Sequence, residues 1–132
     1  MRWMGRTLLL VSAIGAADSI HRQRPARFAG LRLPGSATQH ALTIGSPLSA
    51  PPLMLAALVA ADRRGRTDLV RLLAAMFIIG ILGEIDTWAD LSDPTAAPIA
   101  TACAAAYVLL PAGMIYATSR TRGCIPRPRP AR

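Results

Sequence analysis

Residues 94–119 read PTAAPIATACAAAYVLLPAGMIYATS and contain no charged side chain. These 26 residues lie between Asp93 and Arg120. At a rise of about 1.5 Å per residue they would form about 39 Å of helix, which exceeds the roughly 30 Å hydrocarbon core of a bilayer. The stretch therefore predicts a membrane-spanning helix at about residues 95–118.

Two further apolar stretches could span a bilayer if their charged ends lie at its surfaces. Residues 7–20 are the shorter, because 14 residues give only about 21 Å of helix, and Asp18 lies within them. Residues 69–88 are long enough. Their Arg71 can extend its guanidinium to one headgroup layer, while acidic residues and Trp88 lie in the other.

Prolines interrupt the remaining stretch, residues 41–61, which has 21 uncharged residues. Proline donates no backbone hydrogen bond, so we expect this segment to begin irregularly and to become regular helix from about Pro52. The sequence thus predicts an all-α integral membrane bundle in one domain, residues 1–119. Its four transmembrane helices are expected at about 7–20, 41–61, 69–88 and 95–118.

Composition supports a membrane class and excludes several others. Of 132 residues, 52% are apolar, and the mean hydropathy is +0.37. All 15 basic residues are Arg, against 7 acidic residues, which gives a net charge of +8. A chain without Lys has no Schiff-base chemistry and no Walker A loop. Because the arginines are divided among loops and a tail without interleaved aromatics, we expect no nucleic-acid binding.

The first apolar stretch has two interpretations. It could be a retained membrane span, or a secretory signal cleaved after Ala17 with residues 1–6 as its charged region. We favour the retained span, because Gly15 and Ala17 fit the small-residue cleavage rule only loosely.

Arginine distribution predicts the orientation, because cytoplasmic loops are enriched in Arg and Lys. The ADRRGRTD turn at residues 61–68 and the Arg/Pro-rich tail at 120–132 should both be cytoplasmic, and the tail is expected to be disordered. Both termini of an inner-membrane protein would then be cytoplasmic. The turn that carries Glu84, Asp86, Asp90 and Asp93 would be external.

The first loop violates this rule, because its arginines would be external: Arg22, Arg24, Arg27 and Arg32. Either they pair with the acidic residues of the other external turn, or the proline-rich stretch is a re-entrant dip that keeps the loop cytoplasmic. The pairing explanation is preferred because it needs no broken helix pair at membrane depth.

Asp18, His21, Glu84 and Asp86 form the candidate polar site. Under the preferred topology they lie in one leaflet, where carboxylates near low dielectric and an imidazole could handle a proton or cation. The plainer interpretation is that polar side chains at span ends meet water. No catalytic motif accompanies them, and an enzyme is not expected. Irregular Cys and His spacing predicts no metal site, and no cofactor is expected.

Small residues recur four apart in three of the apolar stretches, where they permit close helix approach. They either pack the bundle internally or form a docking face for a second copy or another membrane protein. Tyr107, in the middle of the last stretch, should find a hydrogen-bond partner inside the bundle. The candidate packing residues are Ala13, Ala17, Ala57, Ala61, Ala100 and Ala104.

The layout resembles small four-helix bacterial membrane proteins, including DoxX-like and related uncharacterised families. The likeness rests on a short first span, a long loop beginning HRQRPARFAGLRLPG, the basic entry ADRRGRTDLVRLLA to the third span and its acidic exit. The SPLSAPP cluster departs from that layout. The resemblance carries over no functional residue.

The function expected from the sequence is structural or accessory, within a lipid bilayer whose anionic headgroups attract the Arg-rich turn and tail. The alternative is a component of a small-solute or proton/cation transporter that uses the candidate polar site.

Overall fold

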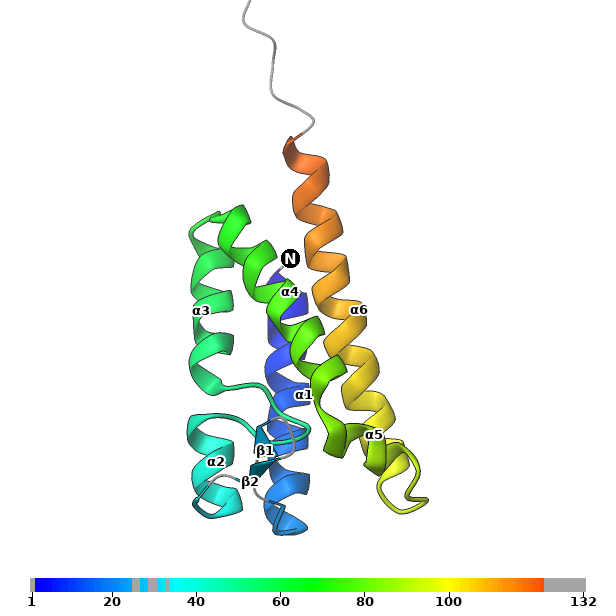
Figure 1. Ribbon diagram of the computed structural model, residues 1–132. Helices are drawn as coiled ribbons and strands as arrows, with labels where there is room; N and C mark the ends of the chain where they lie inside the picture. The colour runs from blue at the N-terminus through cyan, green and yellow to red at the C-terminus, as the bar shows by residue number, and fades with distance from the viewer. Residues whose placement is uncertain (1, 25–26, 29–30, 33, 123–132) are drawn as a thin grey trace, which may run out of the picture.

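The computed structural model describes residues 2–24, 27–28, 31–32 and 34–122. Apart from one hairpin of two-residue strands, regular structure in this part of the chain is helical, which confirms the all-α prediction. In order, the elements are α1 (Arg2–His21), β1 (Arg27–Phe28), β2 (Leu31–Arg32), α2 (Ala37–Thr43), α3 (Pro52–Arg63), α4 (Thr67–Gly83), α5 (Ile85–Leu91) and α6 (Ala97–Arg122) (Figure 1).

The long helices run antiparallel in chain order (Figure 1). One end of the bundle holds the α3–α4 turn and the last turns of α6, and we call it the arginine end after Arg63, Arg64, Arg66 and Arg120. The opposite end holds the last turn of α1, residues 22–24, α5 and the start of α6. We call it the paired end. Residues 22–24 and the α3–α4 turn therefore lie at opposite ends, as the pairing explanation of the first loop requires.

The core lies where α6 packs against α4 and α1, while α3 closes the bundle against α1 and α4. Its large side chains come from every long helix and from the segment between α2 and α3. They include Leu8, Leu48, Leu58, Val70, Phe77, Tyr107 and Met114.

Helix α1 is longer than predicted and buries a different face. It has 20 residues, Arg2–His21, and so begins five residues before the predicted span at 7–20. Its buried side is a stripe of Leu8, Ser12, Gly15 and Ser19, at the spacing of one helix face. A Cβ on Gly15 would lie 2.0 Å from the carbonyl oxygen of Leu48, so only glycine permits this approach.

The small-residue pairs are divided between core and surface. Ala61 and Ala100 are buried, and Ala57 and Ala104 are half-buried. Ala13 and Ala17 are exposed, so packing of α1 within the described chain does not use them.

The second segment consists of two helices with an irregular stretch between them. Helix α3 begins at Pro52, as predicted. Proline suits the first helical position, where its missing N–H would have no partner. Helix α2 was not predicted. Ser36 caps it by accepting the backbone N–H of Gln39, whose side chain accepts the N–H of Ser36 in return.

The third segment was predicted as one helix over 69–88, and this is wrong. Helix α4 ends at Gly83, Glu84 adopts an extended backbone, and α5 begins at Ile85. At the other end, Arg71 does not simply extend outward. Its Nη2 donates to the carbonyl oxygen of Thr118 at 2.6 Å and its Nε to the Thr118 hydroxyl at 3.1 Å.

Helix α6 is the element predicted from residues 94–119. It has 26 residues and continues through the buried Pro111. It also continues through Arg122, so the predicted start of the tail at residue 120 is corrected. Residues 123–132 lie outside the described part. Among the described helices, α6 is the one long and apolar enough to cross a membrane.

Candidate functional site

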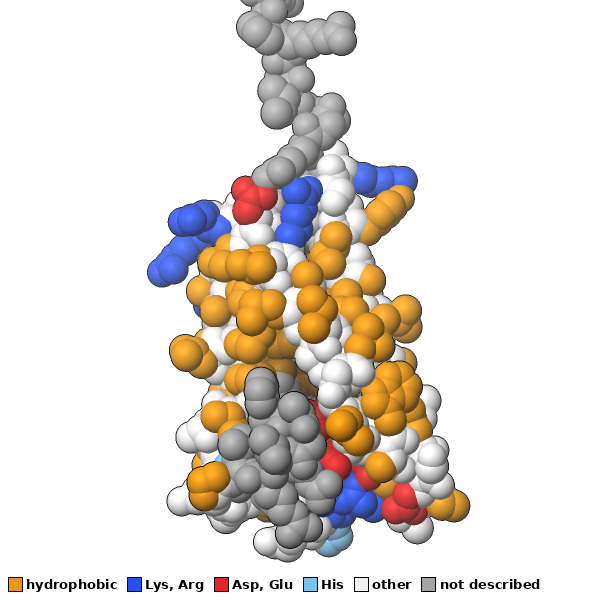
Figure 2. Space-filling view, in the orientation of Figure 1, with side chains coloured by type: hydrophobic (Ala, Val, Ile, Leu, Met, Phe, Trp, Pro, Cys, Tyr) orange, Lys and Arg blue, Asp and Glu red, His pale blue; other side chains and the backbone are white. Residues whose placement is uncertain are grey.

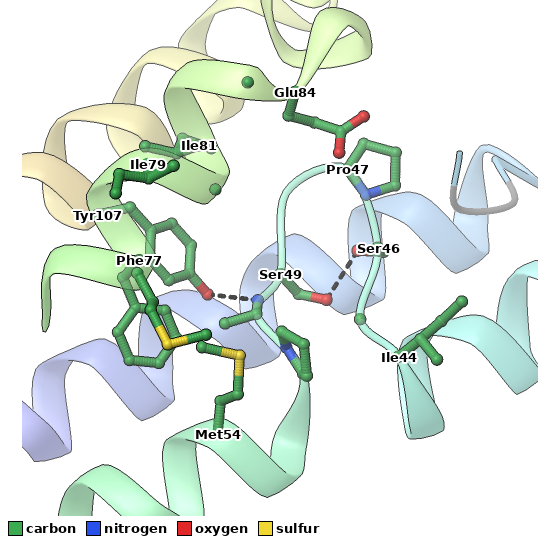
Figure 3. A pocket seen from close by; sticks show the side chains of 16 residues that line it. Ile44, Ser46, Pro47, Ser49, Met54, Phe77, Ile79, Ile81, Glu84 and Tyr107 are labelled. Atoms are coloured by element: carbon green, nitrogen blue, oxygen red, sulfur yellow. Dashed lines mark hydrogen bonds between the residues drawn. The ribbon is translucent and has the colours of Figure 1, made fainter. Parts of the chain in front are cut away.

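A cavity of about 620 Å³ lies between α4 and the irregular segment 44–51 (Figure 3). Met54 of α3 and Tyr107 of α6 also contribute to its wall. The residues that line it are Ile44, Gly45, Ser46, Pro47, Ser49, Ala50, Pro51, Met54, Met76, Phe77, Ile79, Gly80, Ile81, Gly83, Glu84 and Tyr107.

A tight turn gives segment 44–51 its shape. The backbones of Ser46 and Ser49 exchange hydrogen bonds of 2.9 and 3.0 Å, and their hydroxyls are 2.7 Å apart. Gly45 has a φ of +95°, and a Cβ there would lie 2.5 Å from the Ser49 carbonyl oxygen. Glycine is therefore required at this position. The turn leaves two hydroxyls beside the cavity.

Tyr107 fixes the segment to α6. Its hydroxyl accepts the backbone N–H of Ala50 at 2.9 Å, which confirms the prediction of a partner within the bundle. Its ring lies 6.1 Å from that of Phe77, centroid to centroid. A second hydrogen bond, from the Thr87 hydroxyl to the Pro47 carbonyl oxygen at 2.8 Å, joins the segment to α5. Irregular backbone is thereby held from two sides.

Apolar side chains make up most of the cavity wall. Its walls are aliphatic, aromatic and methionine side chains, and Glu84 is the only carboxylate among them (Figure 3). No His or Cys lines it, and its polar side chains are those of Ser46, Ser49, Glu84 and Tyr107. Among the described residues, no group of three His, Cys, Asp or Glu could hold a metal ion.

A polar cluster lies at the paired end, where two arginines join α1, α5 and the turn that precedes α6. Arg22 pairs with Asp18 on α1 at 2.9 Å and donates to the Thr95 carbonyl oxygen at 2.8 Å. Arg24 pairs with Asp90 of α5 and lies 3.9 Å from Asp93. These contacts tie the end of α1 to α5 and to the turn that precedes α6.

Two carboxylates of this network are buried. The side chain of Asp18 is 7% exposed and that of Asp90 is 5% exposed. Each uses Oδ1 for its arginine, whereas Oδ2 has no hydrogen-bond partner in the described part of the chain. An unpaired buried oxygen is costly. Each buried carboxylate is therefore paired through one of its two oxygens only.

Asp93, at the outer edge of the network, is 40% exposed. The backbone N–H and the hydroxyl of Thr95 both donate to its Oδ1 at 2.9 Å. The backbone bond is the first cause that lowers the pKa of Asp93 below its ordinary value, followed by the hydroxyl bond; Arg22 and Arg24 also lower it.

The candidate polar site of the sequence is divided. Asp18, His21, Glu84 and Asp86 all lie toward the paired end, but only Glu84 lines the cavity. Asp18 belongs to the arginine network. His21 is exposed, and Asp86 is half-buried. Asp18 pairs with Arg22, four residues further along the chain.

Sequence reasoning anticipated that first-loop arginines would pair with the acidic turn, and Arg24 does so. Arg22 pairs instead with Asp18 of α1, and the side chains of Arg27 and Arg32 lie outside the described part. Of the four acids expected in that turn, Arg24 reaches Asp90, from α5, and lies 3.9 Å from Asp93. Asp90 is buried because α5 is a separate helix whose inward face also carries Thr87. The spacing of these two residues, three apart, was the available signal.

Comparison with known proteins gives no family for this chain. No protein-family model matches it, and neither a curated protein nor a solved structure matches it significantly.

Proposed function

We propose that this chain is a multi-pass integral membrane protein of structural or accessory type, with four antiparallel segments in the bilayer. Helix α6 is long enough on its own. The 20 residues of α1 and the 17 of α4 would extend about 30 Å and 26 Å, near the roughly 30 Å required. The second segment crosses as α2 and α3. Its irregular residues are bonded within the protein, which is the condition for such backbone at membrane depth.

Exposed apolar side chains on all four segments carry this proposal. Leu10 of α1 is 66% exposed, and Leu53 of α3 is 79% exposed. Ile79 of α4 is 70% exposed and Leu109 of α6 is 68% exposed. Figure 2 shows hydrophobic side chains along the middle of the visible face, with charged side chains toward its two ends. In water this belt would be an aggregation hazard, whereas hydrocarbon solvates it.

The orientation that fits the charges places the arginine end in the cytoplasm and the paired end outside the inner membrane. Both termini are then cytoplasmic. The arginines of residues 22–24 tolerate the external side because they are neutralised by Asp18, Asp90 and Asp93.

The accessory role rests on two features. The cavity wall carries no His or Cys, and α1 exposes Ala13 and Ala17 on its outer surface. Small residues four apart let another helix approach closely in lipid. We propose that this chain packs with a second copy or with another membrane protein through α1.

Cysteine accessibility tests the topology. We would replace Cys103 and Cys124 by Ala and introduce Thr38→Cys on α2 or Ser119→Cys on α6, since both positions are exposed and lie at opposite ends. Thr38 is preferred to Ser36, whose side chain caps α2. With a membrane-impermeant thiol reagent on intact cells, Thr38→Cys should be labelled, and Ser119→Cys should be labelled only after lysis.

Labelling of both positions in intact cells would contradict the orientation. Release of the protein from membranes by alkaline carbonate would contradict membrane integration itself. Either result is readable without any assay of activity.

A second candidate function is transport of a proton or small solute. It is favoured by the position of Glu84 on an apolar cavity and by the buried Oδ2 of Asp18. Proteoliposomes with an internal pH-sensitive dye would test it. If the chain is a transporter, the wild type should dissipate a pH gradient faster than the Glu84→Gln or Asp18→Asn variant. Equal rates for the wild type and both variants would contradict transport and favour the accessory role.

A further inference from the structure

A second concavity, of about 530 Å³, lies between α1 and α3 and reaches the arginine end. Its wall is apolar along most of its length and basic at one end. Leu9 of α1 lines it, together with Pro52, Leu55, Ala56, Val59, Ala60 and Arg63 of α3 and with Arg64, which follows that helix.

The sequence of α3 explains this groove. Pro52, Ala56 and Ala60 are four residues apart and therefore lie on one helix face. Their small side chains leave a depression beside the larger Leu9 of α1. The two helices meet at Gly5, where a Cβ would lie 3.7 Å from Val59. A shallow channel thus follows α3 toward its C-terminal arginines.

The basic end of the groove is exposed and uncompensated. Arg63 and Arg64 are both exposed, and within the described chain neither forms an ion pair with a carboxylate. Arg71, also near this end, is instead bonded to Thr118 and lies 3.9 Å from Asp68. The two groove arginines are therefore available to an external anion.

The length of the groove matches one leaflet. From Pro52 to Arg64 the chain advances 12 residues, or about 18 Å, and half of a hydrocarbon core is roughly 15 Å. A ligand with its anion at Arg64 would have its apolar part reach the bilayer midplane near Pro52. That combination of an anionic head and a chain of leaflet length describes a phospholipid.

We propose that the α1–α3 groove binds one anionic phospholipid, with its phosphate at Arg63 and Arg64 and one acyl chain along Ala56 and Leu9. This inference rests on the proposed membrane location. It goes beyond a general attraction of basic residues to the membrane surface, because it assigns one lipid to one groove.

Native mass spectrometry of the detergent-solubilised protein tests the site. Phosphatidylglycerol and phosphatidylcholine would be titrated separately, and the occupancy of the first bound lipid measured. Phosphatidylglycerol should bind more tightly. Arg63→Gln with Arg64→Gln should weaken its binding about 30-fold, which corresponds to about 2 kcal/mol. The matched control, Arg66→Gln with Arg120→Gln, removes the same charge outside the groove and should leave the first site intact.

A charge-neutral variant tests the apolar half. Ala56→Trp fills the groove and should also reduce phosphatidylglycerol binding, whereas Ala105→Trp, on an exposed position of α6, should not. Glycerol phosphate, which lacks the chain, should not compete. Size-exclusion profiles and melting temperatures would establish that each variant is folded.

Three results would contradict the proposed lipid site in the groove. They are equal losses in the two double-arginine variants, unchanged binding in Ala56→Trp, and full competition by glycerol phosphate. Carbonate extraction of the wild type separates this failure from that of the proposed function. A protein that resists extraction but lacks the site refutes only the inference, and a protein that is extracted refutes the membrane location as well.

Discussion

The two ends of the bundle use arginine in opposite ways. At the paired end, Arg22 and Arg24 are bonded to Asp18 and Asp90, and both carboxylates are buried. At the arginine end, Arg63, Arg64 and Arg66 are exposed. None of the three has a carboxylate partner in the described chain.

This difference separates an arginine that stabilises the fold from one that interacts with the surroundings. A buried carboxylate stripped of its cation is strongly destabilising, whereas exposed charges contribute little to the free energy of unfolding. The same residue type should therefore give different results at the two ends in a stability measurement. In a lipid-binding measurement the order should be reversed.

The largest effect is expected for Arg24→Gln. It leaves Asp90, which is 5% exposed, without its ion-pair partner. We expect a loss of about 3 kcal/mol in the free energy of unfolding, at the lower end of the range for broken buried pairs because Arg24 is itself partly exposed. Denaturation in a mild detergent, followed by circular dichroism, would measure it.

Two controls sharpen this result. Arg63→Gln makes the same chemical change at the arginine end and should alter stability by no more than about 0.5 kcal/mol. The double variant Arg24→Gln with Asp90→Asn removes both charges and should recover part of the loss. Equal destabilisation by Arg24→Gln and Arg63→Gln would contradict the claim that the paired arginine stabilises the fold and the exposed arginine does not.

Arg71 is the exception at the arginine end, and a second prediction uses it. Its two hydrogen bonds to Thr118, of 2.6 and 3.1 Å, hold α4 to the last turns of α6. Arg71→Leu should lower the free energy of unfolding by about 1.5 kcal/mol. This is the lower end of the range for hydrogen bonds that involve a charged group, and it applies because Arg71 is partly exposed. The same denaturation measurement applies.

Arg66→Gln is the matched comparison for Arg71, because it lies in the neighbouring turn and is exposed. It should have almost no effect on unfolding. If Arg71→Leu behaved like Arg66→Gln, the bonds to Thr118 would contribute nothing to stability.

Local chemistry allowed part of this fold to be predicted. The uncharged run before Arg120 predicted α6, and the proline at residue 52 predicted the start of α3. A hydroxyl in an apolar run must be bonded, so the partner of Tyr107 could be expected, although not its identity as Ala50. The pairing of first-loop arginines followed from the sign of their charge.

Contacts between distant segments decided the rest. Alanine spacing favoured Ala13 and Ala17 as the packing face of α1, whereas the approach of Leu48 requires Gly15 and turns the neighbouring face inward. Glu84 interrupts the third segment without a proline, and Gly83, a poor helix former, is the one local signal for the break between α4 and α5. Which acid meets Arg24 depends on that break, because it directs Asp90 inward.

The smallest expected effect concerns Asp93, the exposed acid of the paired end. Hydrogen bonds from Thr95, first from its backbone N–H, lower the pKa of Asp93 below 3.8. A carboxyl whose pKa is lower in the folded state contributes stability that is complete above 3.8 and is lost as the pH falls through the folded value. The wild type should therefore melt slightly above Asp93→Asn at neutral pH, and the two melting temperatures should converge below 3.8.

The comparison of wild type with Asp93→Asn isolates this group. Asp18 and Asp90 are present in both proteins, so their titration contributes equally to the two curves and cancels in the difference. Asn can still accept the bonds from Thr95, so only the charge is removed. A difference in melting temperature that stays constant with pH would show that the charge of Asp93 is not what its bonds and the neighbouring arginines stabilise.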